Sequence, residues 1–348
     1  MSAPKLSVVM PVHNGERYLR EAVESVLNQT FTDFEFIIIN DGSTDTTQAI
    51  LENYPDSRLV VVNREHQGLV ASLNQGLTLA RGEYVARQDA DDISLSTRFA
   101  TQIDYLDKNP EVVLVTSDYE RIDSKGCLLG RMRREGNPSL VAWYLLFYNH
   151  VAGHSLVVFR RDPVVDLGGY SGRRRHIEDY DLWLRLSNVA DIVILPDVLL
   201  RWRMHDESIS SQCNKEQEAS AVDLAREFIM DLIGAEISLD EVWELRGFWL
   251  HRFPNTQRAG SLHARLKVIY QAFLQQRLRH STAAPELSSH LRKAVGERFL
   301  NWVQFLLSKS CMFSVTKILV YALAWDPMRV LTWGLKGSLR ALLPRSSA

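Results

Sequence analysis

The stretch RGEYVARQDADD, residues 81–92, places three carboxylates directly after a short apolar segment. We predict a buried strand at residues 84–86, and Asp89, Asp91 and Asp92 follow it closely. The carboxyl ends of parallel strands open into the crevice where α/β sheets bind ligands. Close carboxylates repel one another, so the cluster favours a hard cation such as Mg²⁺ or Mn²⁺ bridging to a phosphate. A solvated acidic turn would show the same pattern, because the Asp-x-Asp motif alone is common.

The residues before this stretch alternate between apolar runs and amphipathic segments. Buried strands are predicted at residues 6–12, 34–40 and 59–63. Helices are predicted between and after them, at residues 17–29, 44–53 and 69–80. Repeated strand–helix units imply an α/β fold with a mostly parallel central sheet, flanking helices and right-handed crossovers.

Beyond residue 121 the alternation of predicted strands and helices becomes less regular. Helices are expected near residues 139–148 and 178–188, and short strands at 155–160, 192–195 and 198–204. Pro196 separates the last two strands, because proline has no N–H to donate to a sheet. From residue 214 onward only helices are expected. The predicted organisation is therefore an α/β domain at residues 1–213 followed by an all-α region at 214–348.

Composition is that of an ordinary globular protein, with 348 residues, 46% hydrophobic and a net charge of −2. The charge is uneven, since residues 246–348 contain 16 Lys and Arg against 3 Asp and Glu. Three isolated cysteines indicate a reducing compartment. We find no signal peptide before the first predicted strand and no apolar run of transmembrane length, so we expect a cytoplasmic protein. Nothing indicates a nucleic-acid partner.

Two further polar segments follow predicted strands and are expected in the same crevice. Pro11 and His13 lie in the segment 11–15, and Asp41 lies in the segment 40–45. A buried carboxylate at Asp41 can accept hydrogen bonds from a base or a ribose, although a turn that caps a helix explains the segment equally. Neither the GxGxxG pattern nor the GxxxxGK[ST] loop is present, so a dinucleotide-binding fold and a P-loop ATPase are not supported.

Three more residues have a functional and a structural explanation. Glu178 and Asp179 begin a predicted helix, where the helix dipole favours acids. Asp179 is equally placed to face the crevice as a general base. His205 follows the last predicted strand and is either a metal or diphosphate ligand or a structural histidine.

Taken in order, the segments 11–19, 40–45, 80–92, 168–186 and 203–210 resemble the family 2 inverting glycosyltransferases, which have the GT-A fold. The resemblance covers about residues 5–211 and divides the first domain into a nucleotide-binding half, 1–120, and an acceptor-side half, 121–213. The resemblance implies that Pro11, His13 and Asp41 bind the nucleoside. It implies that Asp89 and Asp91 form the Asp-x-Asp pair, with Asp91 as metal ligand, and that His205 binds the metal or the diphosphate. It also implies that Asp179 is the catalytic base, with Glu178 beside it. Many members have Tyr at the position of His13, which leaves the base preference open.

The resemblance implies a Mg²⁺- or Mn²⁺-dependent enzyme that moves one sugar from a UDP- or dTDP-linked donor to a glycan or lipid-linked acceptor in cell-surface polysaccharide synthesis. The Gln-x-x-Arg-Trp motif of processive synthases is absent. A nucleotidyltransferase would need a Gly-rich basic loop after the first strand, and the segment 13–17 matches that poorly. A non-catalytic sugar-nucleotide-binding protein is the third alternative, and the joint presence of Asp91, Asp179 and His205 argues against it.

The C-terminal segment 285–343 is apolar, aromatic and basic. In its last predicted helix one face carries Met328, Leu331, Leu335, Leu339 and Leu342, and Arg329, Lys336 and Arg340 lie away from it. Such a helix suits peripheral contact with the inner face of a membrane, and it suits an ordinary packed bundle equally.

Overall fold

The structure is a computed structural model that describes residues 3–206, 208, 213–278, 284–309 and 311–333. Contacts within the chain divide it into two compact units. The first unit comprises residues 1–145 and 149–221, and the second comprises residues 146–148 and 222–348. The domain boundary that the sequence places after residue 213 stays a prediction.

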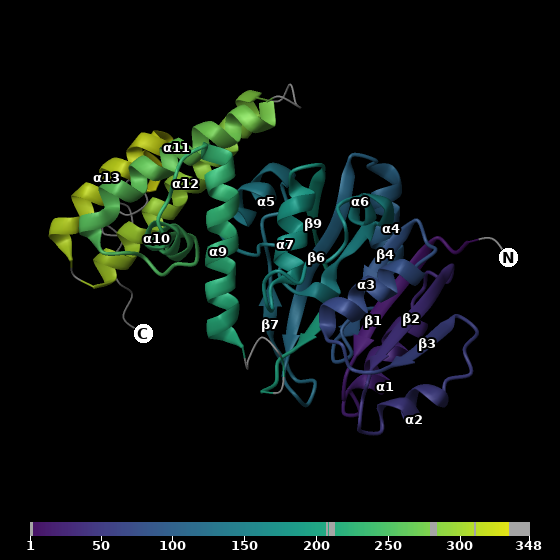
Figure 1. Ribbon diagram of the computed structural model, residues 1–348. Helices are drawn as coiled ribbons and strands as arrows, with labels where there is room; N and C mark the ends of the chain where they lie inside the picture. The colour runs from purple at the N-terminus through teal and green to yellow at the C-terminus, as the bar shows by residue number, and fades with distance from the viewer. Residues whose placement is uncertain (1–2, 207, 209–212, 279–283, 310, 334–348) are drawn as a thin grey trace. The chain divides into compact units, whose positions relative to one another are not determined.

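The first unit contains a mixed sheet, drawn as arrows in Figure 1. Its strands are β1 (Leu6–Val12), β2 (Phe34–Asp41), β3 (Leu59–Arg64), β4 (Tyr84–Arg87), β5 (Ile93–Ser94), β6 (Val112–Ile122), β7 (Leu128–Met132), β8 (Val158–Arg160) and β9 (Asp191–Arg203). They follow the order β3-β2-β1-β4-β8-β6-β9-β5, and β7 pairs with β6. Strands β1 to β4 pair in parallel, as do β6 and β9, whereas β5, β7 and β8 run antiparallel to their neighbours. Most of the pairing is parallel, which confirms the predicted α/β class.

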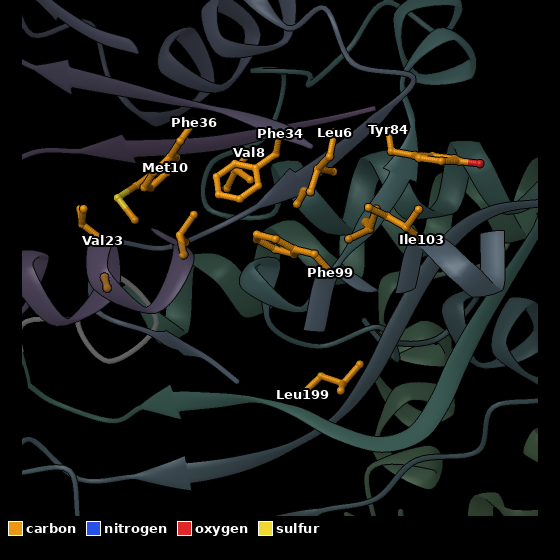
Figure 2. Packing of buried hydrophobic residues seen from close by; sticks show 14 of the residues in the cluster. Leu6, Val8, Met10, Val23, Phe34, Phe36, Tyr84, Phe99, Ile103 and Leu199 are labelled. Carbon is orange, nitrogen blue, oxygen red and sulfur yellow. The ribbon is translucent and has the colours of Figure 1, made fainter. Parts of the chain in front are cut away.

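Helices cover both faces of this sheet. They are α1 (Leu19–Leu27), α2 (Thr47–Glu52), α3 (Leu69–Leu79), α4 (Arg98–Lys108), α5 (Pro138–Leu145), the 3₁₀ turn η1 (His154–Leu156), α6 (Arg161–Asp166) and α7 (Glu178–Ser187). Because side chains alternate along a strand, Leu6, Val8 and Met10 of β1 share one face. Figure 2 shows them packed with Phe99 of α4 and with Val23 of α1.

The opposite face of β1 packs against α3, which explains a glycine in that helix. A Cβ atom added to Gly76 would lie 2.3 Å from Cγ1 of Val9. The close approach of helix and strand therefore requires glycine at this position.

The prediction of two short strands around Pro196 is wrong. Residues Asp191–Arg203 form one strand, β9, which pairs with β6 along its length. The register shifts between Ser117 and Asp118, whose partners are Leu195 and Val198. Pro196 therefore lies in a bulge where no ladder hydrogen bond is required of it, so the strand continues.

The second unit is helical, as the sequence predicts for this region. Its helices are α9 (Asn214–Ile233), which begins in the first unit, α10 (Leu239–Trp249), the 3₁₀ turn η2 (Thr256–Arg258), α11 (Ala259–Leu278), α12 (Ala284–Ser308) and α13 (Met312–Trp325). A capping box between Ser238 and Glu241 begins α10. Stacked and edge-on rings of Phe248, Phe299 and Trp302 form its aromatic core. Within the described residues, no helix combines the length and apolar character needed to cross a bilayer.

Candidate active site

Three parallel neighbours, β2, β1 and β4, bring most of the predicted site residues to one edge of the sheet. Val12 at the end of β1 is in register with Asn40, and Val9 is in register with Arg87. The chain therefore leaves these strands at adjacent points. His13, Asp41 and the segment 88–92 follow there, as the crevice rule for α/β sheets predicts.

The carboxylate of Asp41 is buried and already holds several donors. Its Oδ1 accepts Nε of Arg64 at 2.7 Å and the N–H of Gln67 at 3.0 Å, and its Oδ2 accepts the N–H of Gly68 at 2.8 Å. Burial alone would raise the pKa of Asp41, but hydrogen bonds from Gln67, Arg64 and Gly68 outweigh it and hold the pKa below its ordinary value. Asp41 thus orders the loop that follows β3, and its direct contact with a nucleoside stays a prediction.

A second histidine, His66, lies beside His13 at this position. The Nδ1 atoms of His13 and His66 are 2.8 Å and 3.1 Å from the carbonyl oxygen of Asp41, and the ring centroids are 4.3 Å apart. The pair forms an aromatic surface at the end of β1, while Pro11 is buried within that strand. The sequence analysis missed His66, although it follows the third strand as His13 follows the first.

The acid cluster is assembled as predicted. Carboxylate oxygens of Asp89, Asp91 and Asp92 lie within 4.8 Å of one another. Ser155 Oγ donates to Asp89 at 2.7 Å, and the buried Asp92 accepts the N–H of Arg203 at 2.9 Å. Burial, followed by the charges of Asp91 and Asp89, raises the pKa of Asp92 well above its ordinary value.

These residues fit a divalent cation. The cluster offers hard oxygen ligands whose mutual repulsion a cation would relieve, which is the donor set of Mg²⁺ and Mn²⁺ sites. His205 joins them from the end of β9, with Nε2 at 2.9 Å from Oδ2 of Asp91. The structure thus brings His205 to Asp91 across the sequence, and its role as a ligand stays a prediction.

Glu178 and Asp179 lie in the first turn of α7. Oδ2 of Asp179 accepts Nδ2 of Asn149 at 2.9 Å, and Oδ1 accepts the N–H of Tyr180 at 2.6 Å. Burial, followed by the charge of Glu178, raises the pKa of Asp179 to about 7. Burial also raises the pKa of Glu178. A carboxyl group that exchanges its proton near neutral pH is chemically suited to general-base catalysis.

Two buried arginines that the sequence analysis missed, Arg87 and Arg98, lie close to the acid cluster. Arg87 is 2% exposed and pairs with Asp89, and its charge also opposes the rise that burial causes in the pKa of Glu178 and Asp179. Arg98 is fully buried and donates to Gln88, to Ser94 and to the carbonyl oxygens of Arg87 and Val157, among others. Burial lowers its pKa to about 9. The hydrogen bonds of Arg98 therefore fix the end of β4, which precedes the acid cluster.

Comparisons with known proteins show which family this chain resembles. A family model described as "Glycosyl transferase family 2" matches residues 7–168. An uncharacterized glycosyltransferase of Haemophilus influenzae is 32% identical over 256 residues, covering 68% of this chain and 78% of the relative. The O-antigen biosynthesis glycosyltransferase WbnJ of Escherichia coli is 32% identical over 230 residues, covering 64% of this chain and 89% of the relative.

Solved structures show the same fold. TarS 1–349 of S. aureus in complex with UDP-GlcNAc superposes with a TM-score of 0.56 at 16% identity, covering 90% of each chain. The mannosyltransferase PcManGT of Pyrobaculum calidifontis, in complex with GDP-Man and Mn²⁺, gives a TM-score of 0.51 at 17% identity, covering 94% of this chain and 88% of that one. The predicted GT-A fold, with its helical C-terminal region, is thereby confirmed.

Proposed function

Because the chain belongs to glycosyl transferase family 2 and is a glycosyltransferase, we propose that it transfers one sugar from a nucleotide-sugar donor to an acceptor hydroxyl with inversion, in a metal-dependent reaction. The observation that carries this proposal is that the charge of Arg87 acts both on the acid cluster and on a second carboxyl group, that of Asp179. Asp91 belongs to a cluster suited to a cation, and Asp179 has a pKa of about 7. Arg87 carries the charge that acts on both groups.

In the proposed mechanism, Asp91 and His205 would hold the divalent cation, and Asp89 would contact the nucleotide. The bound cation would neutralise the negative charge that develops on the leaving nucleoside diphosphate. Pro11, His13 and Asp41, with the loop that Asp41 orders, would hold the nucleoside.

Asp179 takes the proton from the acceptor hydroxyl as its oxygen attacks the anomeric carbon from the face opposite the leaving group. One displacement with one base inverts the configuration at that carbon. Glu178 stays beside the base, and its negative charge helps Asp179 to bind the transferred proton.

A screen of nucleotide sugars tests the proposal directly. Water has a hydroxyl that can replace the acceptor when no acceptor is present, so the full-length protein is incubated with each donor and Mn²⁺, Mg²⁺ or EDTA. We expect nucleotide release from one UDP- or dTDP-linked donor, dependent on the metal and absent in Asp179→Asn. Release that continues unchanged in EDTA would refute the metal dependence.

The choice of acceptor rests on the relatives. WbnJ carries O-antigen biosynthesis in its name, and TarS was crystallised with a UDP-linked sugar. We therefore propose a glycan or lipid-linked acceptor in cell-surface polysaccharide synthesis.

Peripheral membrane contact through the second unit is a separate part of the proposal. In the described residues of α12, α13 and the helical residues 327–333, Phe305, Val320, Met328 and Leu331 are exposed. Leu335, Lys336, Leu339, Arg340 and Leu342 of the predicted amphipathic helix lie outside the described residues. Exposed apolar side chains in a strongly basic region suit an anionic lipid surface at the cytoplasmic face.

Co-sedimentation with anionic vesicles tests this contact. We expect the full-length chain to bind vesicles at low salt, and a chain lacking residues 285–348 to remain in solution. Vesicle binding should weaken as salt screens the charges, and the binding that remains at high salt should come from the apolar side chains. A full-length chain that stays in the supernatant at low salt would contradict the contact.

A further inference from the structure

Asn149 contacts the proposed base from a segment that the mechanism above does not use. It lies between α5 and η1, and its Nδ2 donates to Oδ2 of Asp179 at 2.9 Å. The other group near Nδ2 is the carbonyl oxygen of Ala152, at 3.5 Å. The carbonyl oxygen of Ala152 and the ionised carboxylate of Asp179 only accept hydrogen bonds, so the NH₂ end of the amide faces Asp179 when that carboxyl is ionised.

The carbonyl oxygen of the Asn149 side chain makes no hydrogen bond, within the described part of the chain, that would stabilise the folded state. Oδ1 of Asn149 is buried and has no hydrogen-bond partner among the described residues. Leaving a buried carbonyl oxygen without a donor destabilises the folded state. An apolar residue of the same size would avoid that cost, so the contact with Asp179 is the feature that explains an asparagine here.

Two donors from different segments fix the carboxyl group of Asp179. The N–H of Tyr180 holds Oδ1 from within α7, and Asn149 holds Oδ2 from outside that helix. The terminal torsion of aspartate is soft, so a single donor would leave the carboxyl plane free to turn. Two donors on two oxygens define the direction of the remaining lone pairs, which a general base requires.

We propose that Asn149 is the positioning residue of the general base, holding Oδ2 of Asp179 in place and favouring its ionised form. This inference rests on the proposed function, in which Asp179 accepts the proton. Other charged or titratable groups that act on Asp179 include Glu178, Arg87 and Tyr170. None of them replaces the N–H of Asn149 at Oδ2 in the described structure.

The sign of the effect follows from the hydrogen bond. A donor to the ionised carboxylate lowers the pKa of Asp179, so removing it must raise that pKa further. We expect Asn149→Ala to raise the midpoint of the Asp179 titration by about one pH unit. Asn149→Asp keeps the volume and places a second carboxyl beside Oδ2, so the pair should keep a shared proton to still higher pH.

The test follows the carboxyl group itself in protein labelled with ¹³C-aspartate. The ¹³Cγ resonance of Asp179, identified by its loss in Asp179→Asn, is titrated in the wild type and in both Asn149 variants. Asn109→Ala is the matched control, since it removes an amide that donates to the Tyr105 carbonyl oxygen at 2.7 Å in α4. The second readout is the acid limb of metal-dependent hydrolysis of the donor selected by the screen.

We expect the midpoint and the acid limb to rise together in both Asn149 variants and to stay in place in Asn109→Ala. Activity of Asn149→Ala should fall about fivefold at pH 7, because the ionised fraction of Asp179 falls from about one half to about one eleventh, and recover toward the wild type at pH 9. An unmoved midpoint in both variants, with Asp179→Asn inactive, would overturn this inference alone. Full activity of Asp179→Asn would instead refute the proposed function, and with it the base that Asn149 is said to position.

Discussion

Replacing Asp179 with Asn should make the protein more stable at neutral pH while it removes activity. The folded state raises the pKa of this carboxyl from 3.8 to about 7, so ionising it in the folded protein is unfavourable. At 1.36 kcal/mol per pH unit the penalty is at most about 4 kcal/mol. Because the side chain keeps part of its surface in solvent, we expect about half of that.

The pH dependence has a definite sign. The proton stays bound to the folded state between about pH 4 and pH 7 and is lost from the unfolded state, so this group lowers stability as pH rises through that window. Asp179→Asn cannot lose a proton and avoids the penalty. Asn149 can turn its amide over to meet the new NH₂ group, since its Oδ1 has no partner among the described residues.

Thermal unfolding of the two proteins at pH 4 and pH 8 measures this effect. The midpoint of Asp179→Asn should exceed that of the wild type by a few degrees at pH 8, and the gap should close near pH 4. Asp162→Asn is the control, because its side chain is 84% exposed and should show no gap at either pH. Equal midpoints at pH 8, or a less stable variant, would refute the reasoning from burial.

Four other substitutions probe the site and its support. Asp91→Ala should weaken nucleotide binding in the presence of Mn²⁺ or Mg²⁺ and leave metal-free binding nearly unchanged, and equal loss in both conditions in a calorimetric titration would make the cluster structural. His205→Gln should raise the Mn²⁺ concentration for half-maximal nucleotide release by about tenfold, because Oδ2 of Asp91 loses its neighbour; an unchanged metal titration would exclude the role. Arg98→Met should cost about 3 kcal/mol of unfolding free energy, as it strips donors from buried carbonyl and amide oxygens, and denaturant curves matching the wild type would contradict this. Gly76→Ala should cost about 1–3 kcal/mol by forcing Cβ into Val9, and an unchanged denaturation midpoint would show that α3 can move away from β1.

The elements that the sequence predicts well are those whose burial leaves a pattern. Strand β1 has the predicted bounds, because a strand covered on both faces is a nearly continuous apolar run. Helix α4 was not predicted, since Arg98 and Gln102 on its buried side interrupt the apolar period. These polar groups are buried only because carbonyl oxygens from β4 and from residues 156–157 satisfy them, which depends on tertiary contacts.

The site residues also fall into those that the sequence pattern could place and those that it could not. Asp89, Asp91 and Asp92 could be placed from one segment, because a single strand end delivers all three. His66 and Asn149 could not, since each meets its partner through a loop whose path the sequence pattern does not define. For Asp41 the sequence predicts the position at the end of a strand. It does not predict the hydrogen bonds that Asp41 accepts from Arg64, Gln67 and Gly68.

The configuration of the released sugar tests the central claim most directly. Full-length enzyme, Mn²⁺ and the selected donor are followed by ¹H NMR from the first minutes, before the free sugar equilibrates between its anomers. A single displacement with Asp179 as base predicts that the first product has the anomeric configuration opposite to that of the donor, and that none forms in Asp179→Asn. A first product with the donor's own configuration would contradict the account, because retention requires a different arrangement of catalytic groups.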